Sequence, residues 1–114
     1  MKMEIDVIEL PPNAELTAHP FAGLLPFMSD EEYTHLKTDL RLHGQQKRIM
    51  LFNGTILDGR NRDRALRELG MHRLCEEFIG DEAKALSYVL STNIHHRNLS
   101  VGQRAAIASR IANM

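Results

Sequence analysis

The stretch from Arg48 to Gly59, RIMLFNGTILDG, is the feature that most constrains the fold of this chain. Two short apolar runs flank Asn53-Gly54, a pair favoured in two-residue hairpin turns because both turn positions need positive φ. The pattern therefore predicts a β-hairpin whose second strand ends at Asp58-Gly59. A length of 114 residues allows one domain with one modest core around this hairpin.

The segment before the hairpin is expected to hold one strand and one helix. Residues 4–10 have the character of a strand, and four prolines punctuate residues 11–26. Ser29 and Glu32 form a capping-box pattern that begins a helix, and Gly44 is its natural end. The apolar residues that recur at helical spacing in this helix are Tyr33, Leu36 and Leu40.

The segment after the hairpin alternates between helix and strand. A short helix is expected over residues 61–69, with Gly70 closing it, and a strand is expected over residues 72–79. Asp81 is placed to cap a further helix that runs to about residue 91. The residues of that helix expected to face inward are Ala83, Leu86, Val89 and Leu90.

A last helix is expected from Val101 to the end of the sequence, opened by a second capping box of Ser100 and Gln103. This helix has no stop signal, and its apolar residues still lack partners at Met114. We therefore expect either that the chain is a fragment or that this helix packs on another domain or another copy.

Together these elements predict an α+β fold, in which helices pack around a small mixed sheet that contains the hairpin. Three regions are expected along the chain. Residues 1–28 form an irregular N-terminal segment with a first strand, residues 29–95 form the core, and residues 96–114 begin a C-terminal helical region.

The composition indicates a soluble, cytoplasmic protein. Hydrophobic content of 43% and charged content of 25% are ordinary for a globular domain. No stretch approaches the ~18 apolar residues of a membrane span, and the acidic N-terminal residues argue against a signal peptide. The single cysteine, Cys75, excludes an internal disulfide and a cysteine-rich zinc site, and its apolar neighbours predict an inert core thiol.

Charge is unevenly distributed along the chain, although the net charge is only −1. Residues 1–40 contain two Lys or Arg and eight Asp or Glu, a balance of −6. Residues 41–114 contain twelve and seven, a balance of +5. Such clusters commonly form a solvated face, but the basic second part also suits an anionic partner such as a nucleotide or nucleic acid.

Three arginines follow the hairpin at every second position, Arg60, Arg62 and Arg64, directly after Gly59. A glycine between a strand and a helix N-terminus is a common anion site, because free N–H groups and the helix dipole point at the ligand. Positive charges at a helix N-terminus are unfavourable for an isolated helix, because they oppose the helix dipole. A phosphate bound by the planar guanidinium groups would offset this repulsion. The alternative is that these arginines pair with surface acids. Asp58 could hydrogen-bond the turn, pair with an arginine or help to hold a metal.

A second polar cluster is expected between two helices, in the stretch STNIHHRNLS. Adjacent histidines rarely point at one ion, and a third ligand at helical spacing is missing, so we expect no zinc site. The stretch is interpreted as a basic loop that meets a ligand or a DNA backbone, with a plain helix connector as the alternative. Its candidate residues are Asn93, His95, His96 and Arg97.

Three stretches that together cover residues 19–114 resemble the N-terminal domain of the ParB family, which has the ParB/sulfiredoxin-like fold. HPFAGLLPFMSDEEYTHLKTDLRLHGQ is similar to the opening of ParB-like proteins of plasmids, phages and mobile elements. GQQKRIMLFNGTILDGRNRDRALRELG resembles the family's Gly-Gln, hairpin and Gly-x-x-Arg box. TNIHHRNLSVGQRAAIASRIA resembles its Glu-Asn-x-x-Arg box and the helix leading toward a DNA-binding helix-turn-helix.

The resemblance implies a DNA-binding module in bacterial plasmid or chromosome partition or in transcription control. It implies that the domain binds CTP or another nucleotide with Mg²⁺, hydrolyses it weakly at most and closes on DNA. A homodimer of the full-length protein is expected separately, because the final helix exposes apolar residues. The residues implied to contact the triphosphate are Gly59, Arg60, Asn61 and Arg62, with Asn93 and the following residues covering it. Gln45 and Gln46 are implied to line the nucleotide pocket.

The sequence departs from the family pattern in its second box. Thr92 stands at the position of the metal-supporting glutamate, and His96 at the position of the arginine, with Arg97 displaced by one. These departures bear on Mg²⁺ coordination and on CTP hydrolysis. The alternatives on the same fold are a nuclease, a nucleotide-dependent phosphotransferase, or an interaction domain whose arginines bind only DNA phosphates. Sulfiredoxin activity is not expected, because Cys75 lies outside the glycine box.

Overall fold

The computed structural model describes residues 6–24, 28–96 and 109. The expected helix from Val101 and the candidate Arg97 lie outside the described residues. The elements in chain order are β1 (Ile8–Leu10), the short 3₁₀ helix η1 (Ala22–Leu24), α1 (Asp30–His43), β2 (Ile49–Phe52), β3 (Thr55–Asp58), α2 (Arg60–Glu68), β4 (Arg73–Glu77) and α3 (Glu82–His96). No helix in this described part of the chain is both long and apolar enough to cross a membrane.

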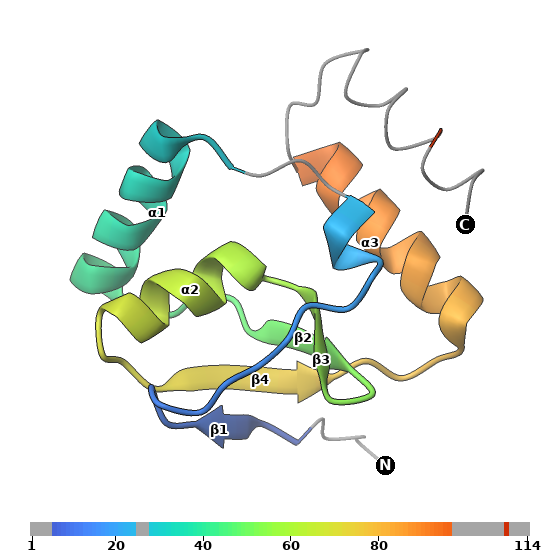
Figure 1. Cartoon of the computed structure of the whole chain (residues 1–114), viewed down its shortest axis with the longest axis horizontal. Helices are drawn as coiled ribbons and strands as arrows, with labels where there is room; N and C mark the ends of the chain where they lie inside the picture. Colours follow the sequence, from blue (N-terminus) through green and yellow to red (C-terminus); the bar gives the residue numbers. More distant parts are fainter. Residues whose placement is uncertain (1–5, 25–27, 97–108, 110–114) are drawn as a thin grey trace.

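The four strands form one mixed sheet in the order β1-β4-β2-β3 (Figure 1). β1 pairs with β4 and β2 pairs with β3 in antiparallel fashion, whereas β2 and β4 run parallel. The turn of the β2–β3 hairpin has positive φ at both Asn53 (53°) and Gly54 (77°), as two-residue hairpin turns require. The predicted α+β fold with a mixed sheet and an inner hairpin is therefore confirmed.

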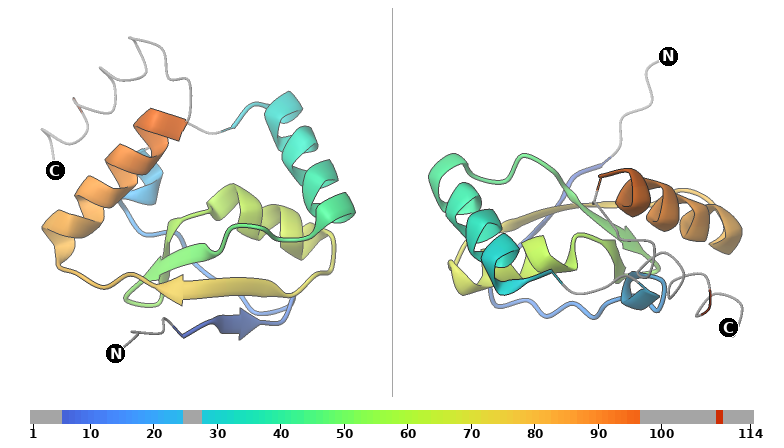
Figure 2. Two further views of the ribbon diagram at one scale, coloured as in Figure 1. Left: turned by 180° about the vertical axis from the view of Figure 1, so that it is seen from behind. Right: turned by 90° about the horizontal axis from the view of Figure 1, so that it is seen from above.

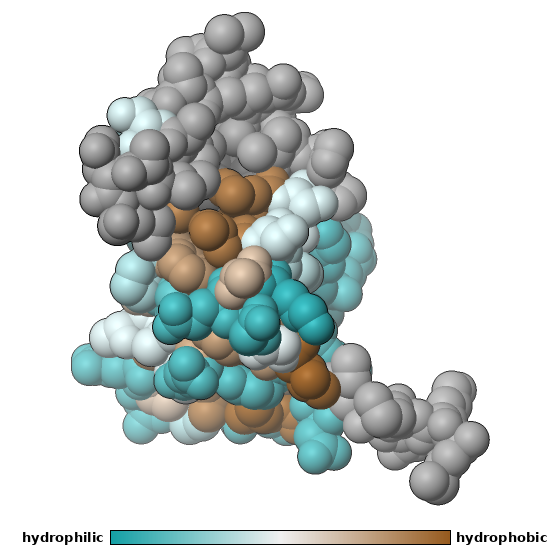
Figure 3. Space-filling view, turned by 90° about the vertical axis from the view of Figure 1, so that its right-hand side faces the viewer, coloured by the Kyte–Doolittle hydropathy of each residue, from teal (hydrophilic) through white to brown (hydrophobic). Residues whose placement is uncertain are grey.

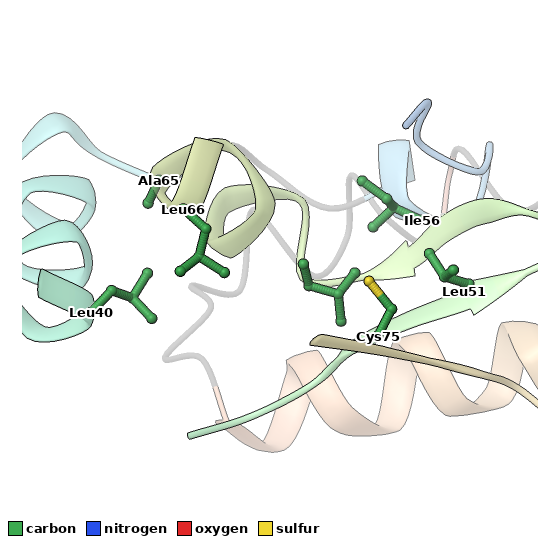
Figure 4. Packing of buried hydrophobic residues seen from close by; sticks show 7 residues of the cluster. Leu40, Leu51, Ile56, Ala65, Leu66 and Cys75 are labelled. Atoms are coloured by element: carbon green, nitrogen blue, oxygen red, sulfur yellow. The ribbon is translucent and has the colours of Figure 1, made fainter. Parts of the chain in front are cut away.

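Helices cover both faces of the sheet (Figure 2). Successive residues of a strand point to opposite sides, so one strand can contribute side chains to a core on each face. Ile49 and Leu51 of β2 join a core with α1 and α2, whereas Phe52 joins a second core with η1 and α3. Figure 4 shows the first core, with Leu40 and Leu66 facing one another from two helices. The fully buried residues of this core are Ile49, Ala65, Leu66 and Cys75, so the prediction of a core thiol is confirmed.

Local signals in the sequence fix the ends of α1 and α2. Ser29 and Glu32 form the predicted capping box, and the N–H of Gly44 bonds the carbonyl of Leu40 at the end of α1. α2 ends one residue before Leu69, after which Gly70 takes a positive φ of 67°. These short-range signals were sufficient to place both helices.

α3 differs from its prediction in length and in one residue of its inner face. Asp81 caps it as predicted, through a 2.9 Å bond from the Lys84 N–H to its carboxylate. The helix then continues to His96 rather than ending near residue 91, since the sequence there contains no glycine or proline to stop it. The inward position of Val89 is confirmed, and Leu86 and Leu90 pack partly buried against the same core. Only Ala83 was wrong: it is exposed, and Ala85, one turn before Val89, is fully buried in its place. The side of the molecule that α3 forms shows hydrophobic residues above a hydrophilic band (Figure 3).

A buried ion pair connects α2, β4 and the N-terminal segment. Arg73 of β4 is 0% exposed and bonds the carboxylate of Asp63, which α2 contributes. The same guanidinium donates to the carbonyls of Pro11, at 2.9 Å, and Ala14. Beyond these residues the segment runs along β3, where the Ile56 N–H bonds the Thr17 carbonyl at 2.8 Å (Figure 1). The N-terminal segment therefore supports the strand that leads to the arginine-rich turn.

Candidate phosphate site

The turn between β3 and α2 has the backbone geometry of an anion site. Gly59 adopts φ 101° and ψ 22°, a left-handed conformation that side chains rarely accept, and α2 begins at Arg60. No side chain caps this helix, and the first N–H groups of any α-helix lack intrahelical acceptors. A Cβ on Gly59 would lie 3.4 Å from Ile49 Cγ1, so the turn packs directly against β2. Backbone donors are thus presented at a turn that only glycine fits without strain.

Arg62 places its guanidinium at this turn. Its Nη1 would lie 3.7 Å from a Cβ on Gly59, so the side chain folds back over the glycine. Burial lowers the pKa of Arg62, while the carboxylates of Asp58 and Asp39 act in the opposite direction. Among the described residues, no hydrogen bond or ion pair to the Arg62 side chain is present. Arg62 is therefore a partly desolvated cation beside a helix N-terminus, which is a favourable arrangement for an incoming anion.

Arg64 lies in a different environment, on the outer side of α2. Its Nε bonds Glu68 Oε1 at 3.0 Å, and its guanidinium lies 4.3 Å from the ring centroid of Tyr33. Glu68 also accepts from the Tyr33 hydroxyl at 2.5 Å and from Lys37 Nζ at 3.2 Å. Pairing with surface acids, the alternative considered from the sequence, describes Arg64 well. Its prediction as a phosphate ligand gains no support from this placement.

The two faces of α2 explain why the arginines separate. Residues 60, 64 and 67 lie on one side of a helix, whereas residue 62 is turned by about 200° from residue 60. Arg64, Arg67 and Glu68 line a shallow hollow with Pro12 on the outer side. Arg60 and Asn61 are partly buried at the helix start. The structure thus brings Gly59 and Arg62 together but places Arg64 apart from them.

α3 approaches the same turn from the other side. Burial raises the pKa of Tyr88, and the charge of Asp58 adds to the increase, while a hydrogen bond with Thr92 opposes it. α3 therefore places Tyr88 within electrostatic range of Asp58, at the end of β3. Asn93, His95 and His96 belong to the last turns of α3, so the predicted loop between two helices was wrong at these positions. Contact of these second-box residues with the Gly59 turn stays a prediction.

The two glutamines before the hairpin have different surroundings. Gln45 Nε2 donates to the carbonyls of Lys47 at 2.8 Å and Leu74 at 2.7 Å, and its Oε1 accepts from the Leu74 N–H at 2.8 Å. Its amide therefore extends the pairing between β2 and β4. Gln46 is exposed. Contact of either glutamine with a nucleotide stays a prediction.

The Asp63–Arg73 ion pair, which lies next to the candidate phosphate site, was not predicted from the sequence. A signal was present, since Arg73 alternates with the buried Cys75 along a strand. A charge on a buried face requires an opposite charge or hydrogen-bond acceptors, and Asp63 lies on the inward side of α2. The pair anchors α2 immediately after Arg62.

The fold and site together define a small α+β domain in which a glycine turn opens an arginine-rich helix beside a mixed sheet. This is the fold of ParB N-terminal domains. The structure of a pNOB8-like ParB-N domain in its C2221 form matches with a TM-score of 0.73 and 19% identity over 99% of this chain. A second structure of a pNOB8-like ParB N-domain matches with a TM-score of 0.67 and 22% identity over 99% of this chain.

The chain spans about half the length of these two proteins, covering 47% and 46% of them. No protein-family model and no curated protein matches the sequence.

Proposed function

We propose that the Gly59–Arg62 turn binds the phosphates of a nucleoside triphosphate, with CTP as the first candidate. The chain would then act as a nucleotide-binding part of a ParB-like regulatory or partition module, which works on DNA as a homodimer in the bacterial cytoplasm. The observation that carries the proposal is the half-buried Arg62 guanidinium over Gly59, at a helix start without a side-chain cap.

Physical chemistry favours phosphate at this turn over other ligands. Backbone N–H groups and the helix dipole stabilise negative charge there, and Arg62 adds a planar cation that binds two oxygens at once. Partial burial strengthens the attraction, since a lower dielectric screens it less than water does. Arg64 on the outer side is less suited to binding phosphate, because the Glu68 carboxylate already balances its charge.

Isothermal titration with CTP, ATP and GTP, each with Mg²⁺, tests the proposal. Arg62→Ala is expected to weaken binding about 10- to 100-fold, the range of a charge-assisted hydrogen-bond pair. Arg67→Ala is the matched control, because Arg67 is an exposed arginine of the same helix on the outer side. Absence of heat with all three nucleotides would contradict the proposal, as would equal losses in the two variants.

A second candidate function is binding of the DNA backbone by the outer side of α2. The observation in its favour is that Arg64 and Arg67 are both exposed around one shallow hollow. DNA binding that falls steeply with salt and ignores nucleotide would support it. Arg67→Ala, with Arg62→Ala as control, would then reduce the salt dependence.

A nuclease or phosphotransferase receives less support from the described residues. Glu76 pairs with Arg48 at 3.2 Å, and Glu77 accepts from the Asn53 N–H at 2.8 Å. These carboxylates serve the sheet and the hairpin, and within the described ranges no three His, Cys, Asp or Glu side chains gather as metal ligands. Any triphosphatase activity of the site is therefore expected to be weak.

A further inference from the structure

Arg73 holds the N-terminal strap, residues 11–19, against the start of α2. The strap crosses from β1 to η1 (Figure 1), and its first residues form a tight turn in which the Ala14 N–H donates to the Pro11 carbonyl at 3.1 Å. Arg73 Nη2 donates to both of these carbonyls, and Nη1 donates to the Asp63 carboxylate. One buried guanidinium therefore joins the strap to α2.

Hydrogen bonds lead from this guanidinium to both sides of the phosphate turn. The Asp63 N–H donates to the Gly59 carbonyl at 2.8 Å and so closes the first turn of α2 on the glycine of the site. On the other side, Ile56 of β3 donates its N–H to the Thr17 carbonyl and accepts from the His19 N–H, both at 2.8 Å. The strap is therefore linked to the strand that enters the turn and to the helix that leaves it.

Arg73 depends on the strap for its hydrogen bonds. Its side chain is 0% exposed, and its Nε has no hydrogen-bond partner among the described residues. Release of the strap would take away the Pro11 and Ala14 carbonyls and leave the guanidinium with the Asp63 carboxylate. Buried polar donors without partners are costly, and more so when the group is charged. Undocking of the strap should therefore disturb the Asp63–Arg73 pair, and with it the first turn of α2.

The strap is weakly anchored, which makes its docking reversible. None of residues 11–19 is fully buried, and Leu16 packs only partly buried against the core that α1 and α2 share with the sheet. Segments with few buried apolar contacts open locally at a lower free-energy cost than the rest of a domain. A segment that opens reversibly and is bonded to the site can change the geometry of that site.

We propose that Arg73 is a positioning residue of the phosphate turn, which makes the strap and the first turn of α2 one cooperative unit. Docking of the strap then favours the backbone geometry that binds phosphate. A bound phosphate favours the docked strap in return, because coupling between two sites is reciprocal. This coupling to a ligand rests on the proposed nucleotide-binding function, whereas the cooperative unit itself does not.

Hydrogen exchange without nucleotide tests the cooperative unit. Leu16→Ala loosens the strap outside the turn, and it should speed exchange of the Ile56 and Asp63 amides by a similar factor, about tenfold. Leu36→Ala is the matched control, because Leu36 packs partly buried against the same core from α1, and it should speed neither amide by more than about twofold. An Asp63 amide that ignores Leu16→Ala, or responds equally to Leu36→Ala, would overturn the positioning role of Arg73.

Hydrogen exchange with CTP and Mg²⁺ tests the coupling in the unmutated protein. Saturating CTP should slow exchange of the His19 and Ile56 amides about 5- to 150-fold, the usual range of coupling between sites. The Gly44 amide at the end of α1 is the control and should keep its rate. Strap amides that ignore CTP, when isothermal titration shows that CTP binds, would contradict the coupling but not the proposed function. Absence of CTP binding would refute the proposed function and the coupling, and the Leu16→Ala result would then decide on the cooperative unit alone.

A double variant separates the role of Arg73 from direct contact between nucleotide and strap. Asp63→Leu with Arg73→Met replaces the buried pair by uncharged residues of similar size, a change that proteins often tolerate. It removes the donors to the strap carbonyls, so CTP should slow the His19 amide by no more than about twofold. Full slowing in this variant would show that Arg73 does not carry the coupling. The two measurements above do not depend on the folding of this variant.

Discussion

Arg62 and Arg64 are two residues apart on one helix, yet their environments differ sharply. Arg62 is half-buried over Gly59, whereas the Arg64 side chain is 66% exposed and balanced by Glu68. The difference follows from the 100° turn per residue of an α-helix, which sends positions two apart to different sides. The arginines at the start of α2 therefore do not form a single binding site. The inner face of the helix suits a ligand, whereas its outer face holds α1 and α2 together.

The largest loss of stability is expected from a substitution on the inner face of α2. Asp63→Ala leaves Arg73 buried without its counter-charge, and removal of one partner of a buried ion pair costs about 3–5 kcal/mol. Urea unfolding followed by circular dichroism measures the loss. Glu68→Ala, on the outer face, is the matched control and should cost about 0–1 kcal/mol. Similar losses in the two variants would remove the energetic distinction between the faces.

The next largest loss of stability is expected from replacing the glycines at the two ends of α2. Gly59→Ala combines a left-handed backbone, φ 101°, with a contact of 3.4 Å to Ile49 Cγ1, and should cost about 1–3 kcal/mol. Gly70→Ala has a left-handed φ of 67° but open space around its Cβ, so its cost should stay near 1 kcal/mol. Thermal unfolding of both variants makes the comparison, and a larger loss for Gly70→Ala would contradict the close packing at the site.

Much of the fold could be predicted because its signals are local. The Asn53-Gly54 turn, the Ser29 capping box and the Asp81 cap each depend on contacts within a few residues. The sheet order could not be read in this way, since the parallel pairing of β2 and β4 depends on chain segments about 25 residues apart.

The site was predictable in part. Gly59 and Arg62 were found from their types and positions, but the separation of Arg62 from Arg64 needed the helical rotation to be applied. The Asp63–Arg73 pair required the packing of α2 on β4, which no short stretch encodes. The role of Gln45 was hidden for a similar reason, because its partner Leu74 is 29 residues away.

Substitutions on the outer face of α2 should change stability least, but they should change the pKa of Tyr33 in a specific way. Burial, followed by the hydrogen bond to Glu68, raises the pKa of Tyr33 to about 12 from its ordinary 10.0. A raised pKa in the folded state means that this contribution to stability is complete below pH 10 and is lost as the pH rises toward about 12. Glu68→Ala should therefore lower the pKa of Tyr33 toward 10.0 while reducing stability only slightly.

Ultraviolet titration of the phenolate measures this shift. The chain has two tyrosines, so the Tyr88→Phe background isolates the signal of Tyr33. Arg64→Ala is the informative companion, because its cation lowers the pKa of Tyr33 and its loss should move that pKa upward, opposite to Glu68→Ala. Opposite shifts would show that Arg64 is part of the Tyr33–Glu68 network. If neither variant moved the Tyr33 pKa, Arg64 would not be held in this network, and its separation from Arg62 would have to be abandoned.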